Sequence, residues 1–175
     1  VTPTINSNKV RLTKVGNVKF SHDTSFNQII TASSVVQVHA DHYYPELAFD
    51  GITDGTNYGW ASSQLYSSGT YTGANTTSGY NGEWIQIDIG TTVVLDNLKI
   101  YPGRNAATFN PKSMRLFYSS NGTTWTQGAD WTNLTVADDW YPSSTWTPVT
   151  KTGLALSGRY FRLAINESLG GTYVN

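Results

Sequence analysis

Apolar and polar residues alternate most clearly over residues 83–90, where isoleucine occupies every second position from Ile85 to Ile89. A period of two predicts a strand with one buried face and one face toward solvent. Gly90 ends this run. No window of the chain sustains the period of 3.6 residues that marks an amphipathic helix.

Further strand-like runs cover residues 93–101, 114–118 and 159–165, the last with Phe161, Leu163 and Ile165 inward. Asn121-Gly122 follows the second of these runs and predicts a hairpin, whose next strand carries Trp125. Short strands joined by turns rich in Gly, Asn, Ser and Thr predict an all-β fold, an antiparallel sandwich or barrel.

Residues 62–82 form a polar segment of low complexity, with Leu65 as almost its only core-forming residue. Long unpatterned segments inside a domain are usually functional or disordered. Tyr66, Tyr71 and Tyr80 lie among Ser and Gly, a composition typical of adaptable recognition loops. Two interpretations stay open, a recognition surface and a loose surface insertion.

Composition narrows the class of protein. The chain has 175 residues, enough for one domain, and only 13% are charged against a usual share of about 25%. The formal net charge is −1 without any Lys/Arg cluster, which argues against a nucleic-acid or anionic-membrane partner. There is no cysteine, which excludes disulfides and thiol chemistry. No apolar run reaches the roughly 18 residues of a membrane span, so no membrane insertion is expected.

Several landmarks occur in a familiar order: Ala32-Ser33-Ser34, Pro45-Glu46-Leu47-Ala48-Phe49-Asp50-Gly51, Thr56, Trp60, Gly82-Glu83-Trp84-Ile85-Gln86-Ile87-Asp88-Ile89-Gly90, Tyr101-Pro102, Tyr118-Ser119-Ser120-Asn121-Gly122 and Gly158-Arg159-Tyr160-Phe161-Arg162-Leu163. This set resembles the discoidin superfamily, also called coagulation factor V/VIII type C domains, and within it the family-32 carbohydrate-binding modules. The resemblance implies an antiparallel β-sandwich of jelly-roll type (galactose-binding-domain-like) over residues 28–175, with binding loops at one end.

Two features depart from the family pattern. Members usually close with a further strand that carries a Glu, and this chain ends at Asn175 before that strand would finish. Residues 1–27 precede the usual family start and contain strand-like runs. We expect this N-terminal extension to supply an added edge strand, or the sequence to belong to a longer modular or multimeric protein.

A candidate cation site lies at Asp50, Asp54 and Thr56. Two carboxylates and a hydroxyl near glycines suit Ca²⁺, which prefers oxygen ligands. The family resemblance implies a structural calcium held by Asp50, Thr56 and backbone carbonyls, although the family's C-terminal Glu ligand has no counterpart here. The alternative is an Asx turn in which Asp50 binds its own backbone.

A sugar site needs an aromatic ring for the apolar face of the sugar and a few polar groups for its hydroxyls. The resemblance to galactose-binding relatives points to an Arg and an Asn after the Tyr101-Pro102 strand end and to a His in an early loop. The matching residues are Arg104 and Asn110, with His39 or His42 as the His and Phe109 or Tyr44 as the ring. The alternatives are a solvated loop cation for Arg104 and ordinary packing for each His.

The tryptophans are expected to be structural. Trp60, Trp84 and Trp125 match core positions of the family. Three more lie within residues 130–151 and either form a second recognition surface or, as we favour, fix a long loop onto the sandwich: Trp131, Trp140 and Trp146.

No motif of a hydrolase, metalloprotease or phosphate-binding enzyme occurs, and we expect no enzyme activity. The expected function is non-catalytic binding of a neutral, galactose- or GalNAc-type glycan. The alternative is a structural or adhesive module of a surface layer, filament or viral fibre that works through protein contacts. Both place the protein outside the cell or on a cell or virion surface.

Overall fold

The computed structural model describes residues 9–12 (backbone only), 29–36, 43–49, 59–101, 103, 107–135 and 148–175. Its elements in chain order are β1 (Lys9–Leu12), β2 (Ile29–Ala32), the 3-10 turn η1 (Pro45–Phe49), β3 (Tyr66–Ser67), β4 (Thr70–Tyr71), β5 (Thr76–Thr77), β6 (Tyr80–Asn81), β7 (Glu83–Ile100), the 3-10 turn η2 (Ala107–Phe109), β8 (Pro111–Ser119), β9 (Thr126–Trp131), β10 (Val149–Lys151) and β11 (Leu156–Ser168). No α-helix occurs in these described ranges. The all-β prediction is therefore confirmed.

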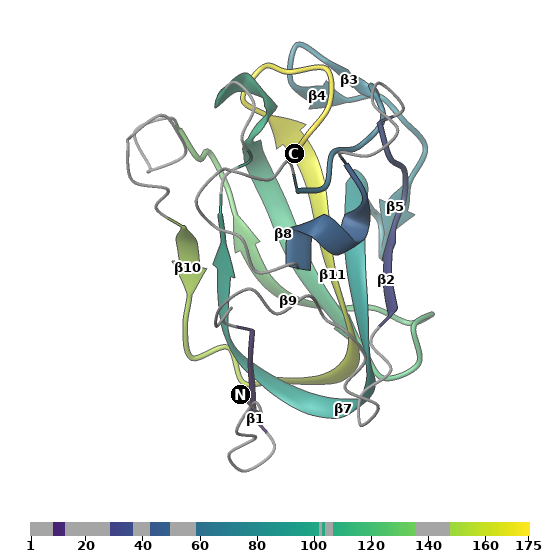
Figure 1. The fold of residues 1–175 in the computed structure, drawn as a ribbon, viewed down its shortest axis with the longest axis vertical. Helices are drawn as coiled ribbons and strands as arrows, with labels where there is room; N and C mark the ends of the chain where they lie inside the picture. Colours follow the sequence, from purple (N-terminus) through teal and green to yellow (C-terminus); the bar gives the residue numbers. More distant parts are fainter. Residues whose placement is uncertain are drawn as a thin grey trace.

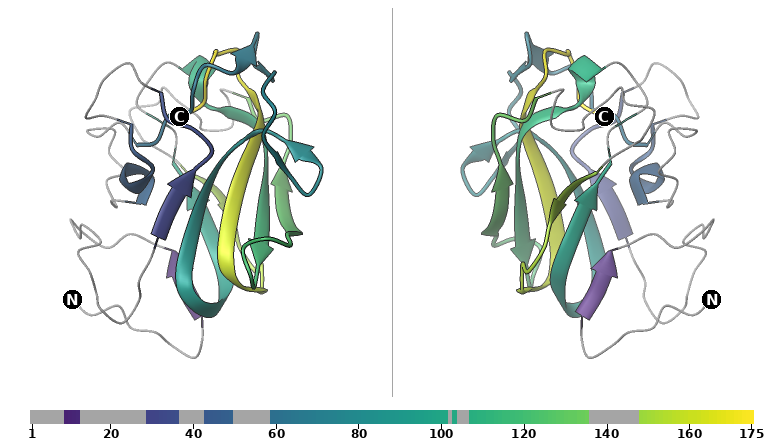
Figure 2. Two further views of the ribbon diagram at one scale, coloured as in Figure 1. Left: turned by 90° about the vertical axis from the view of Figure 1, so that its right-hand side faces the viewer. Right: turned by 90° about the vertical axis from the view of Figure 1, so that its left-hand side faces the viewer.

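Two long strands, β7 and β11, run through the whole molecule (Figure 1). The first half of β7 pairs with β2, and its second half pairs with β1 and β10. β11 pairs with both halves of β7 and, on its other side, with β8, which pairs with β9. Because β7 curves back on itself, its two halves belong to different layers of the sandwich (Figure 2).

All strand pairs in this sheet are antiparallel except one. β1 lies parallel to the second half of β7, with Lys9 opposite Val94 and Leu12 opposite Leu98. The N-terminal extension thus contributes a strand next to β7.

The core lies between the layers and follows the predicted alternation. Ile85, Ile87 and Ile89 of β7 are 6%, 2% and 1% exposed. Across the sheet, Ile87 is opposite Phe161 of β11, which is also buried. The predicted inward faces of residues 83–90 and 159–165 are confirmed.

Trp84 and Trp125 correct the expectation that both are core residues. Trp60 is buried as expected, but Trp84 and Trp125 are half-buried. The reason is the pleat of the strand: Trp84 precedes the inward Ile85 and so lies on the opposite, outer face of the sheet. Trp125 lies just before β9 and contacts Arg162 of β11, whose side chain also points outward.

Trp131, at the end of β9, is buried in the main core cluster at 6% exposure, as the structural interpretation predicts. Trp140 and Trp146 lie outside the described residues.

The polar segment of residues 62–82 is neither a loose insertion nor an exposed tyrosine surface. It folds into two hairpins, β3–β4 and β5–β6. Each turns at a Ser-Gly pair with positive φ, 47° and 84° in the first hairpin and 50° and 82° in the second. A two-residue turn with two positive φ values matches the twist of a hairpin, and glycine adopts such angles without strain. Tyr66 and Tyr71 are buried, with ring centroids 5.3 Å apart.

Glu83, the first residue of β7, holds these hairpins to the sheet. It is fully buried, and its Oε1 accepts hydrogen bonds from Tyr71 Oη (3.2 Å) and Asn75 Nδ2 (3.0 Å). Its Oε2 accepts hydrogen bonds from Ser33 Oγ (2.5 Å) and from Ser34 Oγ. One carboxylate therefore joins the segment after β2, the polar hairpins and β7.

Candidate functional site

The predicted sugar site lies at the end of β7 and the start of β8, which we call the loop end. Tyr101 follows β7 and is 37% exposed. The 3-10 turn η2 then leads into Asn110, whose N–H donates to Ala107 O at 3.0 Å. Asn110 directly precedes β8, so a strand fixes one side of the site.

The C-terminal segment of residues 169–175 fixes the other side. The N–H groups of Leu169, Gly171 and Asn175 donate to the carbonyls of Asn110, Thr108 and Phe109 at 2.9, 2.7 and 3.1 Å. On its other edge the segment accepts hydrogen bonds from the backbone of the polar hairpin region, Tyr66 N to Thr172 O and Ser62 N to Val174 O. Residues 169–175 are therefore held by backbone hydrogen bonds on both sides, although they form no regular strand.

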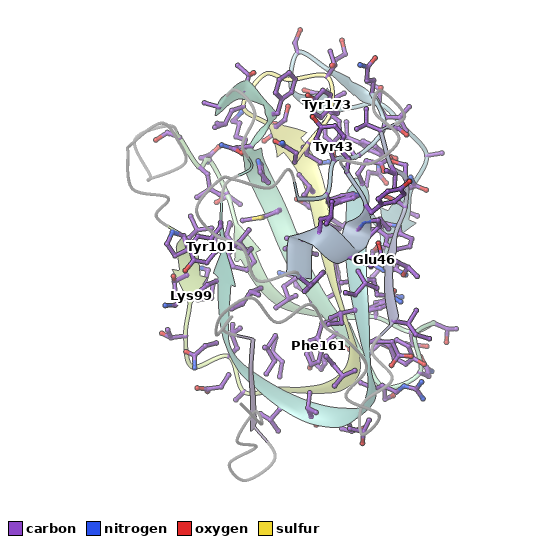
Figure 3. The ribbon with its side chains drawn as sticks, in the orientation of Figure 1. Tyr43, Glu46, Lys99, Tyr101, Phe161 and Tyr173 are labelled. Atoms are coloured by element: carbon purple, nitrogen blue, oxygen red, sulfur yellow. The ribbon has the colours of Figure 1, made fainter. Side chains whose placement is uncertain are left out.

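Aromatic rings gather at the loop end. The ring of Phe109 stacks on that of Tyr173, with centroids 4.1 Å apart and an angle of 8° between the planes. Tyr173 also packs against the small apolar cluster of Tyr43, Val36 and Ala61, and Figure 3 shows Tyr43 and Tyr173 next to each other near the C-terminus. Tyr173 therefore covers one face of the Phe109 ring.

The other predicted ring, Tyr44, directly precedes η1 and is 50% exposed. Its carbonyl accepts a hydrogen bond from Leu47 N at 3.0 Å, which fixes the backbone at this position. Of the two predicted rings, Tyr44 thus offers more accessible surface.

The amide side chains of Asn110 and Asn175 both contact Gly103. Asn110 is fully buried, and its Oδ1 accepts a hydrogen bond from Gly103 N at 3.1 Å. The side chain of Asn175 packs against Gly103, where a Cβ atom would lie 2.5 Å from Asn175 Cγ. Among the described residues, Asn110 Nδ2 and both side-chain polar atoms of Asn175 are buried and have no hydrogen-bond partner. Buried polar atoms in folded proteins are nearly always hydrogen-bonded. Three that lack a partner among the described residues, all close to Gly103, are therefore unusual and mark a candidate binding position.

Of the residues predicted for the sugar site, the structure describes Tyr44, Phe109 and Asn110. The other predicted site residues lie outside the described residues: Arg104, His39, His42, Asp50, Asp54 and Thr56. Asn110 Oδ1 is used by the loop itself, which leaves Nδ2 as the free donor of this side chain. Among the described residues, no three His, Asp or Glu side chains are grouped as a metal site would require.

Tyr173 and Asn175 take part in the loop end although the sequence did not single them out. Both lie in the segment that the family comparison treated as an incomplete last strand. Asn175 N is hydrogen-bonded to Phe109 O and Tyr173 stacks on the Phe109 ring, so both depend on a residue more than sixty positions earlier in the chain. The sequence signal for these two residues was the Tyr173-Val174-Asn175 segment, which combines an aromatic ring and an amide, the two side-chain types that a sugar site needs.

Charged groups beside the loop end are paired. Lys112 Nζ lies 3.7 Å from Glu167 Oε2, which also accepts a hydrogen bond from Ser113 Oγ at 2.7 Å. Residues 101–111 contain Arg104 as their single charged residue. The described part of this end therefore provides no concentrated charge.

The sequence profile of the F5/8 type C domain matches residues 29–175. The chain belongs to this family, which is the discoidin family that the sequence resembles. No curated protein matches the chain.

Solved structures of similar fold include CpGH89CBM32-5 from Clostridium perfringens in complex with GalNAc-β-1,3-galactose, with a TM-score of 0.58, 15% identity and coverage of 85% of this chain and 89% of that one. The family 32 module of NanJ from the same organism, in complex with galactose, has a TM-score of 0.55 and 12% identity, and covers 84% of this chain and 87% of that one. The family 32 module of AlyQ, in complex with 4,5-unsaturated mannuronic acid, has a TM-score of 0.52 and 18% identity over 83% and 87% of the two chains. These likenesses establish the β-sandwich fold. Within the described residues, no helix has the length and apolar character to span a membrane.

Proposed function

We propose that this protein is a non-catalytic carbohydrate-binding module that recognises a neutral, galactose- or GalNAc-type glycan at the loop end. The observation that carries the proposal is the Phe109–Tyr173 ring stack beside the buried amide of Asn110 at one end of a β-sandwich. Tyr44, an exposed ring directly before η1, is the other proposed ring for the apolar face of the sugar. Arg104 completes the proposed site as the donor of two hydrogen bonds from a rigid fork. His39 or His42 adds a further donor or acceptor.

Charge supports a neutral sugar at this position. Arg104 is the single charged residue of residues 101–111, and the nearby Lys112 and Glu167 neutralise each other. One guanidinium group serves sugar hydroxyls well, whereas a polyanionic chain would need several cations. A shallow site of this kind binds a single sugar weakly, so we expect avidity from repetition or from attachment to other modules. Such a module works outside the cell or on a cell or virion surface, as part of a multimodular or multimeric protein.

A glycan array with the Arg104→Ala variant tests the proposal. We expect the wild-type protein to bind galactose- or GalNAc-terminated glycans and the variant to lose at least about tenfold in affinity, since Arg104 makes charge-assisted hydrogen bonds. Lys99→Gln is the matched control, because it removes one positive charge from an exposed position of β7 and should bind like wild type. Equal binding by wild type and Arg104→Ala would contradict the site.

One observation favours the second candidate function, a structural or adhesive module. β1 lies outside the residues that match the family and adds a parallel strand to β7. A sheet edge that accepts an added strand can also accept one from a neighbouring molecule. If the protein binds no glycan on the array and assembles increasingly as its concentration rises, the structural or adhesive function is favoured over sugar binding.

We further propose a structural Ca²⁺ at Asp50, Thr56 and backbone carbonyls of that loop, with Asp54 as an additional ligand. The oxygen-only donor set fits a hard cation, and Asp50 directly follows η1 (Pro45–Phe49) in the sequence. Calcium that binds only the folded state should raise Tm, and EDTA or Asp50→Ala should remove the increase. An unchanged Tm in millimolar CaCl₂ would contradict the calcium site.

A further inference from the structure

Arg162 lies on the outer face of the sheet, between two tryptophans. Its neighbours in β11, Phe161 and Leu163, face the core side, so Arg162 points the other way. The guanidinium carbon lies 4.0 Å from the ring centroid of Trp84 and 4.1 Å from that of Trp125. Trp84 comes from β7 on one side of β11, and Trp125 precedes β9, which lies beyond β8 on the other side. The two indole rings therefore approach the guanidinium from opposite sides.

Neutral groups hold one edge of the same guanidinium. Nε and Nη2 donate to Gln86 Oε1 at 3.1 and 2.7 Å, and Nη1 donates to Thr77 Oγ1 of β5 at 3.1 Å. An arginine carries five N–H donors. Two of them thus have no partner within the part of the chain that the structure describes, although the position of the group is fixed on three sides.

Arg162 also lacks a counter-charge among the described residues. Its pKa is lowered to about 10, because burial removes water from the charged group and no carboxylate offsets this cost. Arg159, three residues earlier in β11, shows the contrast, since its Nε and Nη2 donate to both oxygens of Asp88 at 2.7 and 2.8 Å. The sheet therefore provides a carboxylate for one arginine and none for the next one.

A second arginine on the same face has no ion-pair partner among the described residues. Arg115 of β8 is opposite Ala164 of β11, two residues along from Arg162. Its guanidinium carbon lies 4.4 Å from the ring centroid of Tyr80, and its Nε is buried with no hydrogen-bond partner in the described ranges. Asp130 of β9 is opposite Arg115 in the ladder, but the two form no ion pair. Arg162 and Arg115 thus place two guanidinium groups on this face, and the carboxylates of Asp130 and Glu167 act on the same Tyr80 ring as Arg115 does.

We propose that the outer face of the sheet holds a second binding site, centred on Arg162 and bordered by Trp84 and Trp125, for the carboxylate of an acidic sugar such as a uronic acid. The free N–H donors of Arg162 are suited to a carboxylate, because charge-assisted hydrogen bonds are the strongest that a guanidinium makes. The half-buried indole rings offer apolar surface to the C–H groups of the same sugar. This site is separate from the loop end and does not depend on the function proposed there.

The competing interpretation is that Arg162 only fastens the β5–β6 hairpin to the sheet. Its bond to Thr77 does contribute to that, as do the bond of Ser78 Oγ to Trp125 O (3.3 Å) and the contact of Tyr80 with Phe117. In that interpretation the two N–H donors of Arg162 that have no partner among the described residues would face only water. The two interpretations differ in whether an added carboxylate changes the environment of Arg162.

NMR titration of ¹⁵N-labelled wild-type protein with trigalacturonate makes this distinction without any mutation. We expect the Arg162 Nε–H signal and the indole N–H signals of Trp84 and Trp125 to shift, and galactose to leave them unchanged. Binding should weaken as NaCl increases, because an exposed charge pair is screened. Absence of shifts at about 10 mM trigalacturonate, well above a millimolar dissociation constant, would overturn the proposal.

Variants separate this site from the loop end. Arg162→Lys keeps the positive charge but loses the planar pair of N–H donors that can bind both oxygens of a carboxylate. We expect its binding of trigalacturonate to weaken about tenfold or more. Arg104→Ala should leave that binding unchanged, whatever its effect on galactose. If Arg162→Lys fails to fold by circular dichroism, Trp125→Ala in the β8–β9 loop takes its place with the same expected loss. Wild-type affinity in a folded Arg162→Lys, loss in Arg104→Ala, or equal binding of hexaglutamate would each overturn the acidic-sugar site.

Discussion

The polar segment of residues 62–82 and the loop end are alike in composition, since both consist mainly of Gly, Ser, Thr, Asn and aromatic residues. They differ in how their buried polar atoms are paired. Both oxygens of Glu83 are satisfied by side chains of the hairpins and of the segment after β2. At the loop end, Asn110 Nδ2 and the Asn175 amide are buried and find no partner in the part of the chain that the structure describes. A fully paired polar network specifies structure, whereas unpaired groups next to exposed rings are typical of a place that binds something else.

The largest expected effect comes from breaking the paired network. Glu83→Ala removes a fully buried carboxylate and leaves the buried Tyr71 hydroxyl and three part-buried donors without this acceptor, and we expect it to lower the free energy of unfolding by at least about 3 kcal/mol. Urea denaturation measures this value. Glu167→Ala is the matched control, since its carboxylate is 30% exposed and should cost about 1 kcal/mol or less. Similar losses in the two variants would contradict the structural role of Glu83.

A smaller loss is expected at Tyr66. Its hydroxyl donates to Ile165 O at 2.8 Å in the buried core, and burial raises its pKa. Tyr66→Phe leaves that carbonyl unpaired and should cost about 1–2 kcal/mol in urea denaturation. Tyr101→Phe, at an exposed position, should change stability by less than about 0.5 kcal/mol. A neutral Tyr66→Phe would show that this hairpin is not held by its buried hydrogen bonds.

A pH-dependent effect is expected at Asp88. The Arg159 guanidinium beside it lowers the pKa of this carboxyl below its ordinary value of 3.8. The unfolded chain then takes up a proton at higher pH than the folded chain. The ion pair therefore contributes stability above about pH 4, and this contribution is lost as the pH falls through the folded-state pKa. Thermal melts from pH 5 to pH 2 should show a steeper loss of Tm in wild type than in Asp88→Asn, and parallel curves would contradict the pair.

The smallest expected effect is at Asn175, whose side chain at the loop end is compared with that of Asn75 in the polar segment. Asn175→Ala removes polar atoms that have no partner, so we expect stability to change by less than about 0.5 kcal/mol. Asn75→Ala removes a donor to Glu83 and should cost about 1–2 kcal/mol. The two variants delete the same side chain from the two regions. Equal losses would show that the loop end is as fully paired as the hairpins.

The strands and their faces could be predicted from the sequence because alternation acts locally. The same rule also identifies Trp84 as outward, since it precedes Ile85 and shares a face with Gln86. The expectation that Trp84 is buried came from a family position and was wrong. The two hairpins of the polar segment also had a signal, because each contains a Ser-Gly pair, Ser68-Gly69 and Ser78-Gly79, between strand-forming residues.

The loop end could be predicted only in part. Phe109 and Asn110 were candidates through the family resemblance, at positions after Tyr101-Pro102. The stack of Phe109 on Tyr173 had no such signal, because it joins the residue before Asn110 to one in the C-terminal segment, far away in the sequence. Arg162 was missed for a similar reason. Its two indole rings come from β7 and from the loop before β9, and only the order of strands in the sheet brings them together.

A crystal structure of the protein soaked with galactose tests the central claim most directly. We expect sugar density at the loop end, beside Arg104 and Asn110, with Tyr44 or Phe109 against the apolar face of the sugar. Density only on another surface, or none at a galactose concentration well above the measured dissociation constant, would contradict the claim that this end of the sandwich binds a neutral glycan.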